Sequence, residues 1–165
     1  DVWSVRKVGV PEQKELAMGA VSLGGICHVN NNIMAHYHVS DADALQVIAN
    51  ERQELARRNK LYRHDKRAPD LKDKTVILVD DGMATGATMH AAVLSLREAH
   101  AQRIVVAVPV AAASACATLQ DIADEVICLH VPDPFLGVSQ GCEDFLQTSD
   151  DEVLEILSSM EEAHA

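Results

Sequence analysis

The stretch Thr75-Val-Ile-Leu-Val-Asp-Asp-Gly-Met-Ala-Thr-Gly-Ala-Thr-Met89 decides the fold that we predict for this chain. Its first five residues, 75–79, are apolar or β-branched without a break, which predicts a strand buried on both faces. Asp80 and Asp81 follow directly, and a turn of small residues leads into a helical pattern after Thr88. A strand, a tight turn and a helix N-terminus in this order present backbone N–H groups and a helix dipole to an anion.

The turn departs from three better-known phosphate-binding or catalytic loops. A P-loop requires Lys after its last glycine, where this chain has Ala87, and a dinucleotide fingerprint requires a third glycine. The nucleophile elbow of serine hydrolases places Ser at the position of Ala84. A phosphate-binding turn preceded by two acids remains. Because carboxylates repel phosphate, we expect Asp80 and Asp81 to face ribose hydroxyls or a phosphate-bound Mg²⁺. The alternative is a ligand-free strand, solvated turn and capped helix.

Composition limits the class of protein. The 165 residues are 48% hydrophobic, enough for one globular domain with a sizeable core. A net charge of −11 argues against nucleic acid and anionic membranes as general partners. No apolar run approaches the length of a membrane span. The four cysteines lack Cys-x-x-Cys spacing and are typical of a reducing compartment, so we expect a cytoplasmic location.

The rest of the chain predicts an α/β order. We expect strands at 2–8, at several short places within 12–39 (residues 33–39 among them), at 103–110 and at 126–131, and helices at 40–62 and 114–122. Alternating buried strands and helices predict a parallel sheet with helices on both faces. Ligands of such sheets bind beyond the strand C-termini, where Asp80, Val110 and His130 would emerge.

Histidines and cations offer further candidates. A zinc site built from His28, His36 and His38 is the less favoured reading, because no matching acid or cysteine accompanies them. Nine of the fourteen basic residues lie between Arg52 and Lys74, a segment that includes Lys66 and Arg67. They form either a solvated helix face or a mobile hood that brings positive charge to a bound ligand.

Residues 79–88 resemble the phosphoribosyl pyrophosphate signature of type I phosphoribosyltransferases. The flanking blocks 6–11, 15–20 and 143–150 resemble a bacterial subgroup usually labelled "predicted phosphoribosyltransferase", so that nearly the whole chain is covered. The resemblance implies a three-layer α/β/α fold with a mostly parallel twisted sheet. It also implies a single domain, 1–165, with a hood at about 12–72, a core at about 73–131 and a C-terminal hood and helix at about 132–165.

The same resemblance implies an activity and a site. The activity is a glycosyltransferase reaction of pentosyltransferase type: ribose-5-phosphate passes to a nucleobase-like, small-molecule acceptor and pyrophosphate is released. Asp80 and Asp81 would hold the ribose and Mg²⁺, which binds mainly through phosphoribosyl pyrophosphate. Arg6 and Lys7 would bind pyrophosphate, and Phe135 would stack on the acceptor base. The 5′-phosphate would lie on Gly82, Met83, Ala84, Thr85, Gly86, Ala87 and Thr88.

The resemblance leaves open the catalytic residue, the acceptor and the role of the chain. Family members that act on 6-oxopurines carry an acid where this chain has Ala84, which disfavours hypoxanthine or guanine. Relatives also carry an earlier strand and helix whose connecting turn binds pyrophosphate. No Gly-rich turn precedes Arg6, so we expect this sequence to be a fragment of a longer product. A non-catalytic sensor of phosphoribosyl pyrophosphate and a degenerate structural domain are the alternatives; the family also suggests a homodimer.

Overall fold

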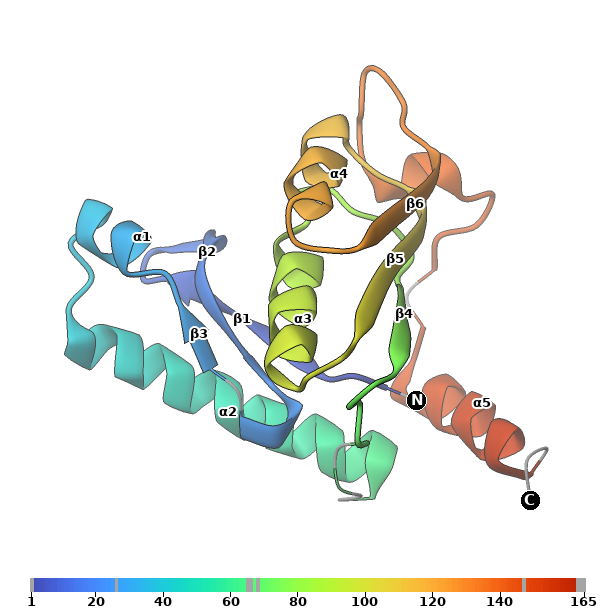
Figure 1. The fold of residues 1–165 in the computed structure, drawn as a ribbon, viewed down its shortest axis with the longest axis horizontal. Helices are drawn as coiled ribbons and strands as arrows, with labels where there is room; N and C mark the ends of the chain where they lie inside the picture. The colour runs from blue at the N-terminus through green and yellow to red at the C-terminus, as the bar shows by residue number, and fades with distance from the viewer. Residues whose placement is uncertain (1, 26, 65–66, 68, 147, 163–165) are drawn as a thin grey trace.

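The structure is a computed structural model that describes residues 2–25, 27–64, 67, 69–146 and 148–162. It contains an antiparallel sheet from the first part of the chain and a parallel sheet from the second, with helix α3 between them (Figure 1). The elements are β1 (Val5–Val10), β2 (Gln13–Ser22), η1 (Leu23–Gly25), β3 (Cys27–Val29), α1 (Asn31–His36), α2 (Asp41–Arg63), β4 (Thr75–Val79), α3 (Ala87–Glu98), β5 (Arg103–Val110), α4 (Ala113–Gln120), β6 (Glu125–His130), η2 (Val138–Gly141) and α5 (Asp150–Glu162).

The parallel sheet confirms the α/β class. Its order is β4-β5-β6, with Val79 beside Ala107 and Val110 beside His130. The strands therefore end at one edge, as expected. Helices α3 and α4 pack their apolar faces on alternate strand residues, because successive side chains of a strand point to opposite faces. The core formed there is centred on Val93, Leu96, Ile104, Val106 and Leu119.

The opposite face of this sheet differs from the expectation. The prediction that residues 75–79 are buried on both faces is wrong, because Ile77 is 64% exposed and Val79 is 74% exposed. Within 126–131, expected as a buried strand, Leu129 is 81% exposed. Helices α3 and α4 share the other face, so helices on both faces are not seen among the described residues. The continuous apolar runs predicted burial wrongly, because they show that a strand is hydrophobic and do not show whether another layer of structure covers it. Strand β4 is also the edge of the sheet as described.

The antiparallel sheet packs its apolar side chains against α2. Strand β2 pairs with β1 and with β3, and Val8, Met18 and Ile48 lie in the core between sheet and helix. Strand β1 begins at Val5, three residues later than expected. The prediction of an extended piece at 33–39 is wrong, because Asn30 caps a short helix there: its side-chain oxygen accepts from the N–H groups of the second and third following residues.

Helix α2 agrees with the expectation from its capping box. The Ser40 hydroxyl accepts the Asp43 N–H at 3.1 Å, and the helix runs to Arg63 and ends on His64 in the left-handed conformation. Figure 1 shows α2 lying along the antiparallel sheet and α5 extending beyond the far end of α2. Among the described helices, none has both the length and the apolar character that crossing a bilayer requires.

Candidate functional site

The loop between β4 and α3 is held by the end of β5. The Met83 N–H donates to the Val110 carbonyl at 2.9 Å, and the Met83 carbonyl accepts the Ala112 N–H at 2.9 Å. Met83 is 3% exposed, so its side chain anchors the loop in the core. The polypeptide on either side of Met83 is thereby fixed at the carboxyl edge of the parallel sheet, where ligands of such sheets bind.

Two glycines permit this conformation. A Cβ at Gly82 would lie 2.5 Å from Val138 Cγ1 and 2.8 Å from the Val110 carbonyl oxygen, which is closer than atoms pack. Gly86 has φ of 71°, in the left-handed region that glycine adopts without strain, and it is the N-cap of α3. The spacing of these glycines was visible in the sequence. The contact with Val138 of η2 was not, because it joins segments more than fifty residues apart.

Backbone N–H groups of the loop face open space. Within the described part of the chain, the amides of Ala84, Thr85, Gly86 and Thr88 donate to no recorded acceptor, and the Ala87 N–H makes only a long 3.4 Å contact with the Thr85 hydroxyl. The first amides of a helix have no intrahelical partner, and they carry the positive end of the helix dipole. The loop therefore presents a set of donors with the geometry of an anion site.

The two carboxylates stand at the other end of the loop. Asp80 and Asp81 are both exposed, and the Asp81 N–H donates to Asp80 Oδ1 at 3.0 Å. Desolvation of the carboxyl by the surrounding protein is the main reason that the pKa of Asp80 lies above its ordinary value; the bond from the Asp81 N–H opposes this rise in pKa, and the Asp81 charge adds to it. Perturbed acids in a cleft are common at functional sites.

These groups line one cavity of about 220 Å³, which we call the cup. Its lining consists of Asp80, residues 82–89 and, from β1, Lys7. Asp81 follows Asp80 in the chain but does not itself line the cup. The structure thus brings together the predicted 5′-phosphate residues Gly82–Thr88, one of the two predicted ribose acids and one of the two predicted pyrophosphate cations.

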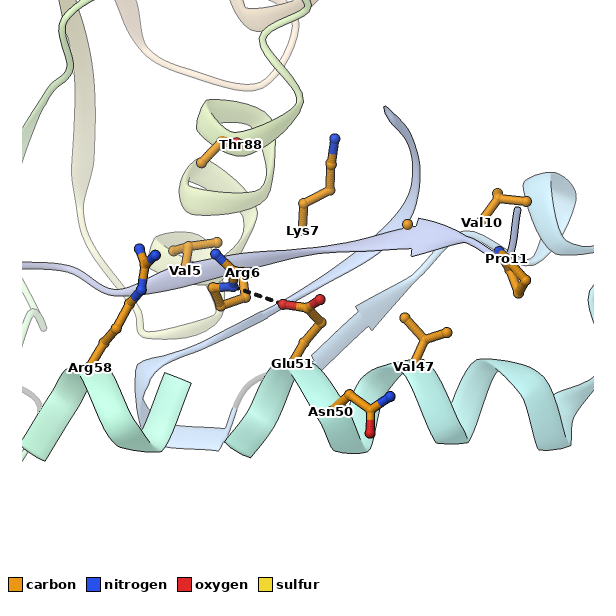
Figure 2. A pocket seen from close by; sticks show the side chains of 11 residues that line it. Val5, Arg6, Lys7, Val10, Pro11, Val47, Asn50, Glu51, Arg58 and Thr88 are labelled. Carbon is orange, nitrogen blue, oxygen red and sulfur yellow. Dashed lines mark hydrogen bonds and ion pairs between the residues drawn. The ribbon is translucent and has the colours of Figure 1, made fainter. Parts of the chain in front are cut away.

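The other predicted cation has a different neighbour. Lys7 and Thr88 lie on one side of β1, whereas Arg6 lies on the side of α2, where its Nε donates to Glu51 Oε2 at 2.8 Å (Figure 2). This follows from the alternation of side chains along a strand. A larger cavity of about 580 Å³ extends from Lys7 and Thr88 past Arg6 to Arg58. Arg6 therefore lies beside the cup and not in it.

The cations of α2 are partly engaged on their own helix. Arg57 and Arg58 donate to Glu54 at 2.8 Å and 2.9 Å, and these bonds lower the pKa of Glu54 to about 2. Arg58 also lines the larger cavity next to the cup. Residue 66 lies outside the described residues. Movement of this segment over a bound ligand stays a prediction.

Phe135 is half-buried in the loop that follows β6, and it is not among the residues that line the cup. The loop is closed by Gln140, whose amide accepts the Leu136 N–H at 2.9 Å and donates to the Pro134 carbonyl at 3.3 Å. The loop continues into η2, which packs under Gly82. Stacking of Phe135 on a base stays a prediction, and the link between the Phe135 loop and the cup runs through η2.

A strand–loop–helix unit of this kind at the carboxyl edge of a parallel sheet, with acids beside it, is typical of α/β proteins that bind phosphorylated ligands. Comparison with known proteins specifies the class further. The model of the family described as "Phosphoribosyl transferase domain" matches residues 32–144, which include the cup loop and Phe135. Arg6 and Lys7 lie outside the matched residues.

Two proteins of Mycobacterium tuberculosis are similar to the chain, one from strain CDC 1551 / Oshkosh and one from strain ATCC 25618 / H37Rv. They are named "Putative phosphoribosyl transferase MT0597" and "Putative phosphoribosyl transferase Rv0571c", and each is 40% identical over 158 residues, 95% of this chain. The chain spans 35% of the length of these relatives. The crystal structure of TT1426 from Thermus thermophilus matches with a TM-score of 0.85 and 37% identity, over 96% of this chain and 75% of that one.

This chain therefore belongs to the phosphoribosyl transferase domain family. The resemblance read from residues 79–88 is confirmed at the level of the family. The ligand roles of single residues are not tested by these comparisons.

Proposed function

We propose that this chain binds phosphoribosyl pyrophosphate in the cup and takes part in transfer of its ribose-5-phosphate group to a small-molecule acceptor, with release of pyrophosphate. The observation that carries the proposal is the set of open amides from Ala84 to Thr88, positioned between an exposed acid pair and Lys7. Each of the three parts of the ligand, a phosphate, a diol and a diphosphate, has a chemically matched group there.

The loop offers the most hydrogen-bond donors to the 5′-phosphate. Its oxygens accept hydrogen bonds from the amides of residues 84–88, and the hydroxyls of Thr85 and Thr88 add donors. Because the loop is fixed through Met83 and the two glycines, it is arranged for the ligand before binding and loses little conformational entropy. Binding of the 5′-phosphate therefore positions the reacting carbon, so that binding energy from a remote part of the ligand assists the reaction.

The acids suit the ribose. A carboxylate accepts hydrogen bonds from two neighbouring hydroxyl groups, and Asp80 stands at the entrance of the cup where the sugar would follow the phosphate. Departure of pyrophosphate leaves positive charge on the ribose ring, as in glycoside hydrolysis. Carboxylates held near the ring stabilise this charge, and Lys7 stabilises the developing charge on the leaving group.

A divalent cation fits the same acids. Carboxylate oxygens are hard ligands that suit Mg²⁺, and in the described residues no group of three or more His, Cys, Asp or Glu side chains is placed to hold an ion unaided. We therefore expect the ion to arrive bound to the pyrophosphate, and Asp80 or Asp81 to complete its coordination. When bound, it would neutralise charge on the diphosphate.

Calorimetric titration of the full chain with phosphoribosyl pyrophosphate and Mg²⁺ tests binding, and pyrophosphate release across a panel of bases tests transfer. We expect saturable binding that Asp81→Asn weakens and that Asp144→Asn, a change of an exposed acid outside the cup, leaves unaltered. Heat changes no larger than those of dilution would refute the proposal. Tight binding with no release from any base would favour the second candidate, a sensor of the ligand, for which the chain's span of only 35% of its curated relatives leaves room.

A further inference from the structure

A further cavity of about 420 Å³, distinct from the cup and from the cavity beside Arg6, reaches the cup loop from the side of the antiparallel sheet. It lies between β2 and α3 and is bounded by the turn that leads from β3 to α1. Thr85, Gly86 and Ala87 line both this cavity and the cup, whereas Lys7 and Asp80 line the cup and not this cavity. We call it the histidine cavity, after His28 and His90 in its lining. Its volume is within the range of small-molecule sites.

The walls of the histidine cavity are apolar. Leu16 from β2, Ile33 from α1 and Leu94 from α3 supply branched side chains, and all three are half-buried. No described residue in the lining is Asp, Glu, Lys or Arg, although the chain as a whole carries a net charge of −11. A concave surface without charged side chains favours binding of apolar groups. Its lining also does not repel an anion, although the protein as a whole is acidic.

The polar groups of the cavity include several hydrogen-bond donors. His28 stands exposed on β3 and His90 is partly buried on α3. Burial lowers the pKa of His90, and the electrostatic effect of His28 acts in the same direction. Both imidazoles belong to the lining of the one cavity. The Asn30 side-chain oxygen already accepts two backbone N–H groups as the cap of α1, so its amide group is left as a donor.

We propose that the histidine cavity binds a small aromatic carboxylate, with the ring against Leu16, Ile33 and Leu94 and the carboxylate accepting hydrogen bonds from His28 and His90. An aromatic ring fills an apolar slot at a low cost in conformational entropy, and hydrogen bonds to an ionised acceptor are stronger than neutral ones. A cationic ligand would find no acid among the described lining residues, and a wholly apolar one would leave the imidazole donors unpaired. This site does not depend on the proposed activity, because it uses different side chains from those of the cup.

The test uses 1-naphthoate and its uncharged counterpart 1-naphthalenemethanol as probes, with the full chain and no phosphoribosyl compound present. Binding is followed by NMR through the imidazole signals. We expect saturable shifts at His28 and His90 with a Kd below about 1 mM for the carboxylate. We expect binding of the alcohol to be about fivefold weaker or more. Because no ligand of the cup is present, the result is independent of whether the cup binds phosphoribosyl pyrophosphate.

Two variants locate the site. The double change His28→Gln with His90→Gln should remove the preference for the carboxylate over the alcohol, whereas His130→Gln, an exposed histidine outside the cavity, should leave it intact. Leu94→Trp should fill the cavity and abolish binding of both probes; if its melting curve shows that it does not fold, the histidine variants carry the test alone. Equal binding of the two probes, or a carboxylate preference that survives in the double variant, would overturn the proposal, as would shifts that do not saturate.

Discussion

The parallel half of the molecule supplies the cup with Asp80 and residues 82–89, and the antiparallel half supplies it with Lys7. In the parallel half the donors are main-chain amides, fixed by the bonds of Met83 to β5 and by the closeness of Gly82 to Val138. In the antiparallel half the contribution is one long side chain, that of Lys7, on a strand whose preceding residue, Arg6, faces α2. The comparison separates an anion site made of fixed main-chain amides from a single side-chain charge. Loss of the shape of the amide loop should therefore weaken ligand binding more than loss of the Lys7 charge.

The largest effect should follow from Gly82→Ala. The new Cβ would meet the Val110 carbonyl and Val138 of η2, so the loop or η2 must move. We expect a loss of about 1–3 kcal/mol in stability and a loss of ligand binding of about 100-fold or more. Thermal unfolding and calorimetry measure the two. Gly25→Ala is the matched control, because Gly25 also has a positive φ but a Cβ there meets nothing within 4 Å. Equal losses in both variants would mean that backbone strain, and not the shape of the cup, is responsible.

A smaller effect on binding should follow from Asp80→Asn and Asp81→Asn. We expect each to weaken binding of phosphoribosyl pyrophosphate by about 10-fold to 100-fold, since an ionised hydrogen-bond acceptor contributes about 1.5–3 kcal/mol. Neither should lower the melting temperature of the ligand-free protein. A fall of several degrees in that temperature would assign the acids to the fold.

The pH dependence of Asp80→Asn sharpens this prediction. Because the pKa of Asp80 is raised in the folded protein, ionisation of Asp80 lowers the free energy of unfolding when the pH is above that pKa. This destabilisation is lost as the pH falls through the pKa. The variant should thus melt slightly higher than the wild type at neutral pH, by no more than about 2 °C for so exposed a group. The difference should shrink on acidification toward pH 4. A difference that grows on acidification would contradict the assigned cause.

Loss of one hydroxyl in the cup should have a moderate effect. Thr85→Val removes a donor while keeping the shape of the side chain, and we expect binding to weaken by about 5-fold to 10-fold. Thr75→Val, at the exposed start of β4, is the control and should leave binding unchanged. Isothermal calorimetry with ribose-5-phosphate, which lacks the diphosphate, would show whether the loss concerns the 5′-phosphate. An unaltered affinity for ribose-5-phosphate would remove Thr85 from that contact.

The smallest effects distinguish the two neighbouring cations. Lys7→Ala should weaken binding of phosphoribosyl pyrophosphate by about threefold to fivefold, because a single ammonium near the diphosphate contributes modestly. Arg6→Ala should leave binding unchanged and cost at most about 1 kcal/mol in stability through loss of the ion pair with Glu51. The reverse pattern would place Arg6, and not Lys7, at the pyrophosphate.

Much of the site was predictable because its signal is local. Asp80, Asp81, the spacing of Gly82 and Gly86 and the start of a helix lie within a few residues of one another, and turn and cap chemistry acts over such distances. The alternating elements from 75 to 131 were predictable for the same reason. The short helix at 31–36 was misread as extended because six residues carry too little periodicity to distinguish helix from strand.

Local patterns in the chain were enough to predict an α/β core with a phosphate-type loop after β4, and residues 79–88 were enough to indicate the family. Three other features emerge only in the folded chain: Lys7 lines the cup while Arg6 pairs with Glu51, Val138 lies under Gly82, and Ile77 and Leu129 face outward. The physical reason is that backbone propensity and turn chemistry are properties of neighbouring residues. The partner of a charge, the layer that covers a sheet face and the walls of a cavity depend on segments that meet only after folding.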